Sequence, residues 1–252
     1  RKALERSEFR VRYQAIVALE DKALAGFEAL IRWIHPKRGL VNPDEFISLA
    51  EETGLIINMD HWVMREACRQ TLEWEKRYGP LTISVNLSAK QFAQPNLVER
   101  ILENLAATGL NPEYLKLEIT ESALMDNTDK AADIIASLKS HKIKLGLDDF
   151  GTGYSSLSYL HRFPVDTLKI DRSFISRMEQ TTENAAIIKT IVALARNMDF
   201  QTVAEGIETD SQLACLKELD CRFGQGYYFS KPLTPEEAEV LLQEYRGQPK
   251  TS

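Results

Sequence analysis

The strongest constraint on the fold is the regular alternation of short apolar, β-branched runs with longer amphipathic stretches. We expect strands at 10–18, 25–33, 81–87, 114–120, 144–149, 167–171, 201–205 and 222–226. Between them we expect helices at 43–52, 58–78, 96–108, 128–141, 182–198, 210–219 and 234–245. Strands that alternate with helices are typical of parallel βαβ units. About eight such strands in 252 residues favour a closed (β/α)8 barrel of the TIM type over an open sheet.

The first two expected strands depart from this pattern. Only a short segment that includes Glu20, Asp21 and Lys22 separates them, and it is too short for a parallel crossover. We therefore predict one antiparallel strand, with the first strand forming a hairpin with the second. The sequence shows no internal repeat and no linker, so we expect a single barrel domain at 9–248. Residues 1–8 would be the end of a linker helix from a longer parent protein, and 249–252 a C-terminal tail.

Composition excludes several classes of protein. The net charge is −6, from 31 basic and 37 acidic residues, whereas proteins that bind polymeric nucleic acid carry a basic excess or stripe. No apolar run reaches the ~18 residues of a membrane helix. The three cysteines, Cys68, Cys215 and Cys221, form no CxxC pair and are expected to be reduced thiols of a cytoplasmic protein. The parent protein could still be membrane-anchored through segments outside this chain.

Polar side chains stand near the carboxyl ends of most expected strands, where barrel enzymes have their active sites. A charge inside an apolar strand costs several kcal/mol unless it is paired or bound to a metal. A single charged residue at a strand end could simply contact water. Solvent contact does not explain why six strands each have such a residue. The candidates are Glu28, Asn86, Glu118, Glu121, Asp148, Asp149, Lys169, Asp171, Glu205, Glu208 and Gln225.

Converging carboxylates would repel one another and raise each other's pKa unless cations neutralise them. Oxygen ligands without His or Cys favour Mg²⁺ or Mn²⁺ over Zn²⁺. The pair Asp148 and Asp149 precedes Gly151 and Gly153, where the backbone can turn so that both carboxylates face one site. A bridging carboxylate with a neighbour can hold two metals ~4 Å apart. These residues indicate metal-assisted hydrolysis of a phosphate ester.

The chain resembles the EAL domain family over almost its whole length. The motif Glu28-Ala29-Leu30 stands in the frame ExLxR, which ends at Arg32. The other matching segments are YQ, RWxHP, PDEFISLAEETGLI, NLS, LEITES, DDFGTGYSSL, KIDRSFI, AEGIET and GQGYYFSKP, in that order. The resemblance implies a barrel with one antiparallel strand. It also implies hydrolysis of 3′,5′-cyclic di-GMP to linear pGpG.

The resemblance assigns roles to individual residues. It implies two divalent cations, Mg²⁺ or Mn²⁺, and Ca²⁺ is expected not to support turnover. Lys169 would orient the attacking water, Gln225 would position water or substrate, Arg32 would hold a phosphate and Gln14 would contact a guanine edge. Leu30 and Asp171 are further candidate substrate contacts. The implied metal ligands are Glu28, Asn86, Glu118, Asp148, Asp149 and Glu205.

The segment after Asp149 resembles the family's mobile loop, which implies a homodimer through this loop with Glu121 and Glu208 as anchors. An upstream sensor or cyclase domain is typical of the parent proteins. Ala15 and Ser48 depart from the family pattern, in which Pro is common at both positions. One ring of Tyr227–Phe229 is a candidate wall of a guanine pocket, and the run Lys142–Lys144 is interpreted as a solvated entry to a strand.

Two other functions stay open. A receptor of this fold would bind cyclic di-GMP without cleaving it and would signal to a partner, but such receptors typically lack a metal ligand or the lysine. An enolase-like barrel also combines Mg²⁺ with acidic strand ends. The EAL frame and the pair Asp148 and Asp149 argue against it.

Overall fold

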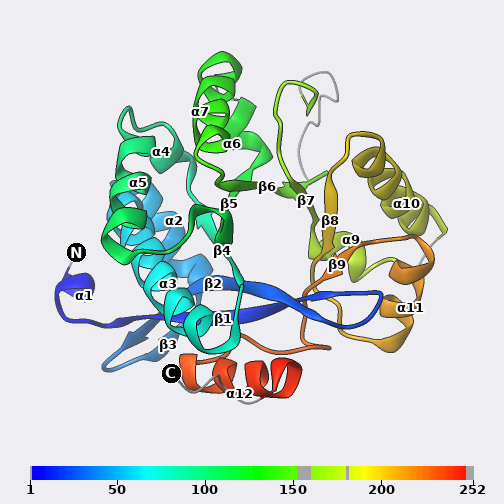
Figure 1. The fold of residues 1–252 in the computed structure, drawn as a ribbon, viewed down its shortest axis with the longest axis horizontal. Helices are drawn as coiled ribbons and strands as arrows, with labels where there is room; N and C mark the ends of the chain where they lie inside the picture. Colours follow the sequence, from blue (N-terminus) through cyan, green and yellow to red (C-terminus); the bar gives the residue numbers. More distant parts are fainter. Residues whose placement is uncertain (1, 126, 152–159, 180–181, 248–252) are drawn as a thin grey trace.

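The central feature of the structure is a closed barrel of strands (Figure 1). The computed structural model describes residues 2–125, 127–151, 160–179 and 182–247. The strands are β1 (Phe9–Ala18), β2 (Leu24–His35), β3 (Gly39–Val41), β4 (Thr82–Leu87), β5 (Leu115–Thr120), β6 (Lys144–Phe150), β7 (Thr167–Ile170), β8 (Gln201–Ala204) and β9 (Phe223–Gly224).

The strand order confirms the expected barrel with one antiparallel strand. The sheet runs β1-β9-β8-β7-β6-β5-β4-β2-β3, and an additional pairing between β1 and β2 closes it. β1 is antiparallel to both of its neighbours, whereas β2, β4, β5, β6, β7, β8 and β9 follow one another in parallel. All carboxyl ends of the parallel strands therefore open at the same mouth of the barrel.

Helices surround the strands in Figure 1. They are α1 (Lys2–Glu5), α2 (Pro43–Thr53), α3 (Ile56–Tyr78), α4 (Ala89–Phe92), α5 (Leu97–Thr108), the 3₁₀ turn η1 (Pro112–Tyr114), α6 (Glu121–Met125), α7 (Thr128–Ser140), α9 (Arg172–Ile175), α10 (Thr182–Asn197), α11 (Asp210–Glu218) and α12 (Pro235–Arg246). Helix α3 packs the buried Trp74 ring against Tyr13 of β1 and Phe27 of β2. Over the described ranges, no helix is both long and apolar enough to cross a membrane.

The differences from the expected elements are local. β2 runs on to His35, whose Nδ1 accepts hydrogen bonds from the backbone N–H groups of Lys37 and Arg38. This turn returns the chain as β3, a strand that the sequence did not reveal. Helix α1 lies within residues 1–8, where the end of a linker helix was expected. The additional helices α4, α6 and α9 span only four or five residues each, which is too short to show a helical period.

The cysteine prediction agrees with the structure. Cys68, Cys215 and Cys221 are all free, and Cys68 and Cys221 are buried. The domain limits at 9 and 248 stay predictions.

Candidate active site at the carboxyl end of the barrel

A cavity of about 480 Å³ lies at the carboxyl ends of the strands. Most of the predicted site residues line it, and they come from both ends of the chain. They are Gln14, Glu28, Leu30, Arg32, Asp148, Asp149, Lys169, Asp171, Glu205, Glu208 and Gln225. The barrel thus brings together polar residues that lie more than two hundred positions apart in the sequence.

Strand periodicity explains most of these positions, because alternate residues of a strand point to the same face. The exception is the pair on β6, where the pairing with β7 shifts register between Leu147 and Phe150. Asp149 has a left-handed backbone, with φ at 54°. Through this irregularity both Asp148 and Asp149 line the cavity, although adjacent residues of a regular strand would face opposite ways.

Lys169 lies at the centre of the site and is almost completely buried. Its Nζ donates to Glu118 Oε2 at 2.6 Å and to Asp148 Oδ2 at 3.2 Å. The same nitrogen lies 2.6 Å from Glu205 Oε1 and 3.5 Å from Glu28 Oε2. One ammonium therefore contacts four carboxylates that belong to four different segments of the barrel.

This arrangement perturbs the titration of the cluster. Burial alone would lower the pKa of Lys169, but the surrounding carboxylates outweigh it and hold that pKa well above its ordinary value. Burial raises the pKa of Glu118 to about 7 and that of Glu205 to about 8, against the opposing effect of Lys169 and with the help of Asp148 and Glu28. The lysine therefore stays a cation, and the carboxyl groups compete for protons near neutral pH.

A set of side-chain amides holds Glu28 in place. Gln225 Nε2 donates to Glu28 Oε2 at 2.7 Å and to Gln14 Oε1 at 3.0 Å. Asn86 Nδ2 donates to the other Glu28 oxygen at 2.7 Å. Burial would raise the pKa of Glu28, but Lys169 and these amides together lower it. Glu28 is therefore held as an ionised carboxylate.

The rim of the cavity carries one arginine and one aromatic ring. The guanidinium of Arg32 is partly buried, and this burial lowers its pKa, although Tyr227 and Glu28 oppose the effect. Tyr227 is 59% exposed and lies under the Lys231 ammonium, with 5.6 Å from Nζ to the ring centroid. Arg32 and Tyr227 both line the cavity and are accessible to an anionic ligand with a planar base.

Three predicted residues lie outside the lining. Glu118 is buried beneath it in contact with Lys169, and Asn86 reaches the site through Glu28. Glu121 is buried at the start of α6. The predicted loop and dimer contacts at 152–156 lie outside the described residues.

Sequence reasoning missed several residues that line the cavity, namely Arg172, Gly206, Gly226 and Pro232. Arg172 directly follows Asp171 at the end of β7, so its place after a strand end was the available signal. Gly206 has a φ of 71°, and a Cβ there would lie 2.7 Å from the Arg172 Cβ.

A supporting contact below the site was also missed. Asp60 of α3 accepts hydrogen bonds from Ser88 Oγ at 2.5 Å and from Ser88 N at 3.1 Å. Burial raises the pKa of Asp60 to about 6, although these hydrogen bonds oppose the shift. The contact fixes the turn two residues beyond Asn86. Nothing in a linear sequence connects Asp60 to this turn.

The donor set is chemically suited to a hard divalent cation. It consists of carboxylate oxygens and one amide oxygen, the ligands that Mg²⁺ and Mn²⁺ prefer. Glu118 Oε1 is buried and has no hydrogen-bond partner, so it is free to accept a further positive group. Across the described residues, no three His, Cys, Asp or Glu side chains could hold an ion in their present arrangement. The Lys169 ammonium lies among the candidate ligands instead.

The chain is similar in sequence to curated proteins of bacteria. The chain is 42% identical to the cyclic di-GMP phosphodiesterase NbdA of Pseudomonas aeruginosa over 98% of this chain and 32% of that protein. It is 43% identical to the bifunctional diguanylate cyclase/cyclic di-GMP phosphodiesterase MucR of the same species, over 94% of this chain and 35% of that protein. The chain thus spans about a third of the length of these curated relatives.

Solved structures show the same barrel. The PaMucR phosphodiesterase in complex with c-di-GMP superposes with a TM-score of 0.91 at 42% identity, covering 94% of this chain and 96% of that one. The FimX EAL domain from Pseudomonas aeruginosa bound to c-di-GMP gives a TM-score of 0.84 at 27% identity, covering 92% and 93%. The family model described as EAL domain matches residues 1–232. By its barrel, its strand-end residues and these matches, the chain belongs to the EAL domain family.

Proposed function

We propose that this domain is a phosphodiesterase that hydrolyses 3′,5′-cyclic di-GMP to linear pGpG with two divalent cations, Mg²⁺ or Mn²⁺. The observation that carries the proposal is the buried Lys169 ammonium among four carboxylates, in a cavity that has Arg32 at its rim. The relatives named as cyclic di-GMP phosphodiesterases support the substrate.

The residues that would hold the cations all contribute oxygen atoms. Bound cations would supply positive charge that stabilises the scissile phosphate and lowers the pKa of a coordinated water. The proton-binding carboxyls of Glu118 and Glu205 would have to ionise to act as ligands. The proposed ligands are Glu28, Asn86, Glu118, Asp148, Asp149 and Glu205.

Lys169 acts as a charged hydrogen-bond donor. Because its pKa lies well above the ordinary value, it cannot accept a proton from water near neutral pH. It can orient the attacking water and stabilise the charge that grows on its oxygen. Glu205, whose Oε1 lies 2.6 Å from Lys169 Nζ, is placed next to this water and, once ionised, could receive the released proton. Gln225 holds Glu28 and positions substrate or water.

Substrate contacts come from the outer part of the cavity. Arg32 holds a ligand phosphate, because a guanidinium can donate two parallel hydrogen bonds to it. Gln14 contacts a guanine edge, and Leu30 and Asp171 contact the remaining ligand surface. Asp171 Oδ1 also accepts the Ser173 N–H at 2.9 Å, which fixes its orientation at the start of α9.

The wider setting is proposed from the family. We expect a homodimer through the loop that follows Asp149, with Glu121 and Glu208 as anchors. We also expect an upstream sensor or cyclase domain in a longer parent protein and a cytoplasmic location. The multidomain relatives, of which this chain matches about a third, support the parent architecture.

The test is incubation of the domain with Mg²⁺ and cyclic di-GMP, followed by chromatography of the nucleotides. We expect pGpG as the product, and Asn86→Ala should lose both binding and turnover because it removes a ligand and frees Glu28. Binding without product by the wild-type domain would instead identify a receptor. Failure to bind cyclic di-GMP would overturn both readings.

A further inference from the structure

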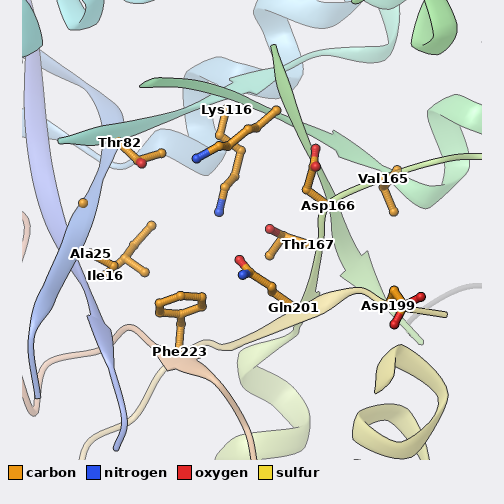
Figure 2. A pocket seen from close by; sticks show the side chains of 12 residues that line it. Ile16, Ala25, Thr82, Lys116, Val165, Asp166, Thr167, Asp199, Gln201 and Phe223 are labelled. Carbon is orange, nitrogen blue, oxygen red and sulfur yellow. The ribbon is translucent and has the colours of Figure 1, made fainter. Parts of the chain in front are cut away.

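A second cavity, of about 420 Å³, opens at the opposite end of the barrel. Its walls are the first inward-facing residues of the parallel strands, so it lies one or more interior layers away from the catalytic carboxylates. Figure 2 shows Thr82, Lys116, Thr167, Gln201 and Phe223 around one common space. None of the proposed catalytic residues lines this cavity.

Lys116 is the central feature of this amino-end cavity. Lys116 is only 8% exposed. Among the described residues, its ammonium group forms no ion pair and no side-chain hydrogen bond. It lies on β5 two positions before Glu118, so both side chains face the barrel interior. Burial lowers the pKa of Lys116, and the charges of Glu118 and Asp166 oppose this effect without outweighing it. An anion in direct contact would therefore stabilise the ammonium.

A second lysine increases the need for a counter-charge. The parallel register pairs Lys116 directly with Lys144 of β6, and both residues line the cavity. Like charges on directly paired strand positions destabilise each other. Lys144 also has no ion pair among the described residues.

The other polar walls can donate hydrogen bonds. Thr167 is 1% exposed, and its Oγ1 is buried with no hydrogen-bond partner. Thr167 is paired in register with Gln201, which also lines the cavity. The cavity thus contains a hydroxyl without a hydrogen-bond partner and two ammonium groups without an ion pair among the described residues. Groups of this kind donate hydrogen bonds to bound oxyanions.

The two acids that line the cavity, Asp166 and Asp199, form no ion pair with these lysines among the described residues. Both oxygens of Asp166 are already engaged, Oδ1 by Lys139 Nζ at 2.5 Å and Oδ2 by the Leu145 N–H at 2.8 Å. Asp199 is exposed at the rim, in a left-handed turn with φ at 58°. Asp166 therefore bonds to Lys139 and the backbone rather than to Lys116 or Lys144.

We propose that the amino-end cavity is an anion-binding site for a small phosphate monoester. Lys116 and Lys144 would bind the phosphate group, and the Thr167 hydroxyl would donate to one of its oxygens. A phosphate dianion matches the two ammonium charges. The cavity leaves additional space for the organic part of a small metabolite. The site is independent of the proposed hydrolysis at the other mouth.

Inorganic phosphate is the probe for this site. The domain is kept free of divalent metal, so that the carboxyl-end cavity does not recruit phosphate, and the methyl groups of Thr82 and Thr167 are followed by NMR. We expect saturable shifts of both methyl signals, while an equal ionic strength of chloride produces none. Lys116→Met should weaken phosphate binding by about tenfold or more, the effect of losing one charged hydrogen-bond donor.

Two matched variants separate this site from general surface charge. Lys142→Met removes an exposed lysine that pairs with Glu113, and it should leave phosphate affinity unchanged. Thr167→Val removes the unmet hydroxyl while it keeps the shape of the side chain, and it should weaken binding even if Lys116→Met does not fold. At one phosphate concentration, thermal unfolding should show clearly less stabilisation of Lys116→Met than of the wild type.

Several results would overturn the proposal. Shifts that do not saturate, or that appear only at residues of the carboxyl-end cavity, would mean that phosphate has no site here. Unchanged affinity in both Lys116→Met and Thr167→Val would have the same meaning. Acetate binding as tightly as phosphate would reject the phosphate monoester and leave only a general anion site.

Discussion

The two mouths of the barrel differ in how their charged side chains are paired. At the carboxyl end, one lysine is enclosed by four carboxylates and every one of these charges has a partner. At the amino end, Lys116 and Lys144 are paired in the strand register, and neither forms an ion pair among the described residues. At the first mouth we propose divalent cations as the missing counter-charge, and at the second we propose a phosphate anion.

Both mouths are built by the same strands. On β5 the interior positions are Lys116 and Glu118, and on β7 they are Thr167 and Lys169. A step of two residues along a strand, about 6.6 Å, therefore separates the carboxyl-end residues Glu118 and Lys169 from the amino-end residues Lys116 and Thr167. Glu118 lies between the two groups of side chains. Its Oε2 accepts a hydrogen bond from Lys169, and its Oε1 has no hydrogen-bond partner.

Exchange of the cation tests the carboxyl end most severely. We expect Mg²⁺ and Mn²⁺ to support hydrolysis of cyclic di-GMP, and Ca²⁺ to give turnover at least ~100-fold lower, because its longer and looser ligand shell widens the metal clamp. Initial rates in each metal after chelation of the others give the comparison. Similar rates in Ca²⁺ alone would contradict the two-metal proposal.

Substitution of lysines at the two mouths should have very different effects. Lys169→Ala should reduce turnover by ~100-fold or more while the affinity for cyclic di-GMP stays within roughly tenfold, because the ammonium stabilises charge that develops during the reaction. Lys144→Met, at the other mouth, should leave turnover unchanged. Initial rates and calorimetric affinities measure both. Near-normal turnover of Lys169→Ala would refute its catalytic role.

Arg32 sharpens the contrast between binding and chemistry within the carboxyl end. Arg32→Ala should weaken affinity for cyclic di-GMP by about 10- to 100-fold and leave the rate at saturating substrate nearly unchanged, because the phosphate is anionic in both ground and transition states. Arg38→Ala is the matched control, since Arg38 is exposed and pairs with Glu45. A loss confined to the saturated rate would assign Arg32 to the chemical step.

The remaining prediction concerns pH. The pKa values of Glu118 and Glu205, about 7 and about 8 in the folded protein, exceed the ordinary value of 4.5. The folded state therefore binds more protons than the unfolded state between these limits, and stability that is complete below about pH 4.5 is lost as pH rises toward 8. The slope is at most about 1.4 kcal/mol per pH unit for each group.

Urea unfolding of the metal-free domain across this pH window measures the effect. Glu118→Gln should flatten the decline, because an amide does not titrate. Saturating Mg²⁺ should also flatten it, since ions that bind only the folded state favour ionised carboxylates. Stability that rises with pH in the metal-free wild type would show that the cluster is ionised throughout.

Periodicity carried most of the fold prediction. The expected strand at 144–149 appears as β6 at Lys144–Phe150, and the expected helix at 43–52 as α2 at Pro43–Thr53. Long repeats of apolar positions reveal such elements because burial on one face imposes them. β3 and the four-residue helices depend on turns and on tertiary contacts, which leave no periodic signal.

The candidate site was predictable where the regular alternation of a strand places its residues. Inward strand positions gave Glu28, Lys169 and Glu205, whereas the β6 irregularity that brings Asp149 to the cavity depends on pairing with β7. The interpretation of Lys142–Lys144 as a solvated strand entry holds for Lys142, which is exposed. Lys144 is partly exposed and lines the amino-end cavity, a position that the sequence did not reveal. Only closure of the sheet distinguishes these two positions.

The antiparallel strand β1 also sets the timing of folding. The pairing of β1 with β2 is local in sequence and can form early. The other edge of β1 can pair only after β9 has been synthesised. The amide contact between Gln14 and Gln225, for example, spans 211 positions. At typical rates of synthesis the ribosome needs roughly 10 to 40 s to cover that distance. Throughout this interval the nascent sheet has an unpaired edge at β1, which is a template for wrong association. Nascent chains stalled before β9 should therefore depend on chaperones more than chains released after it.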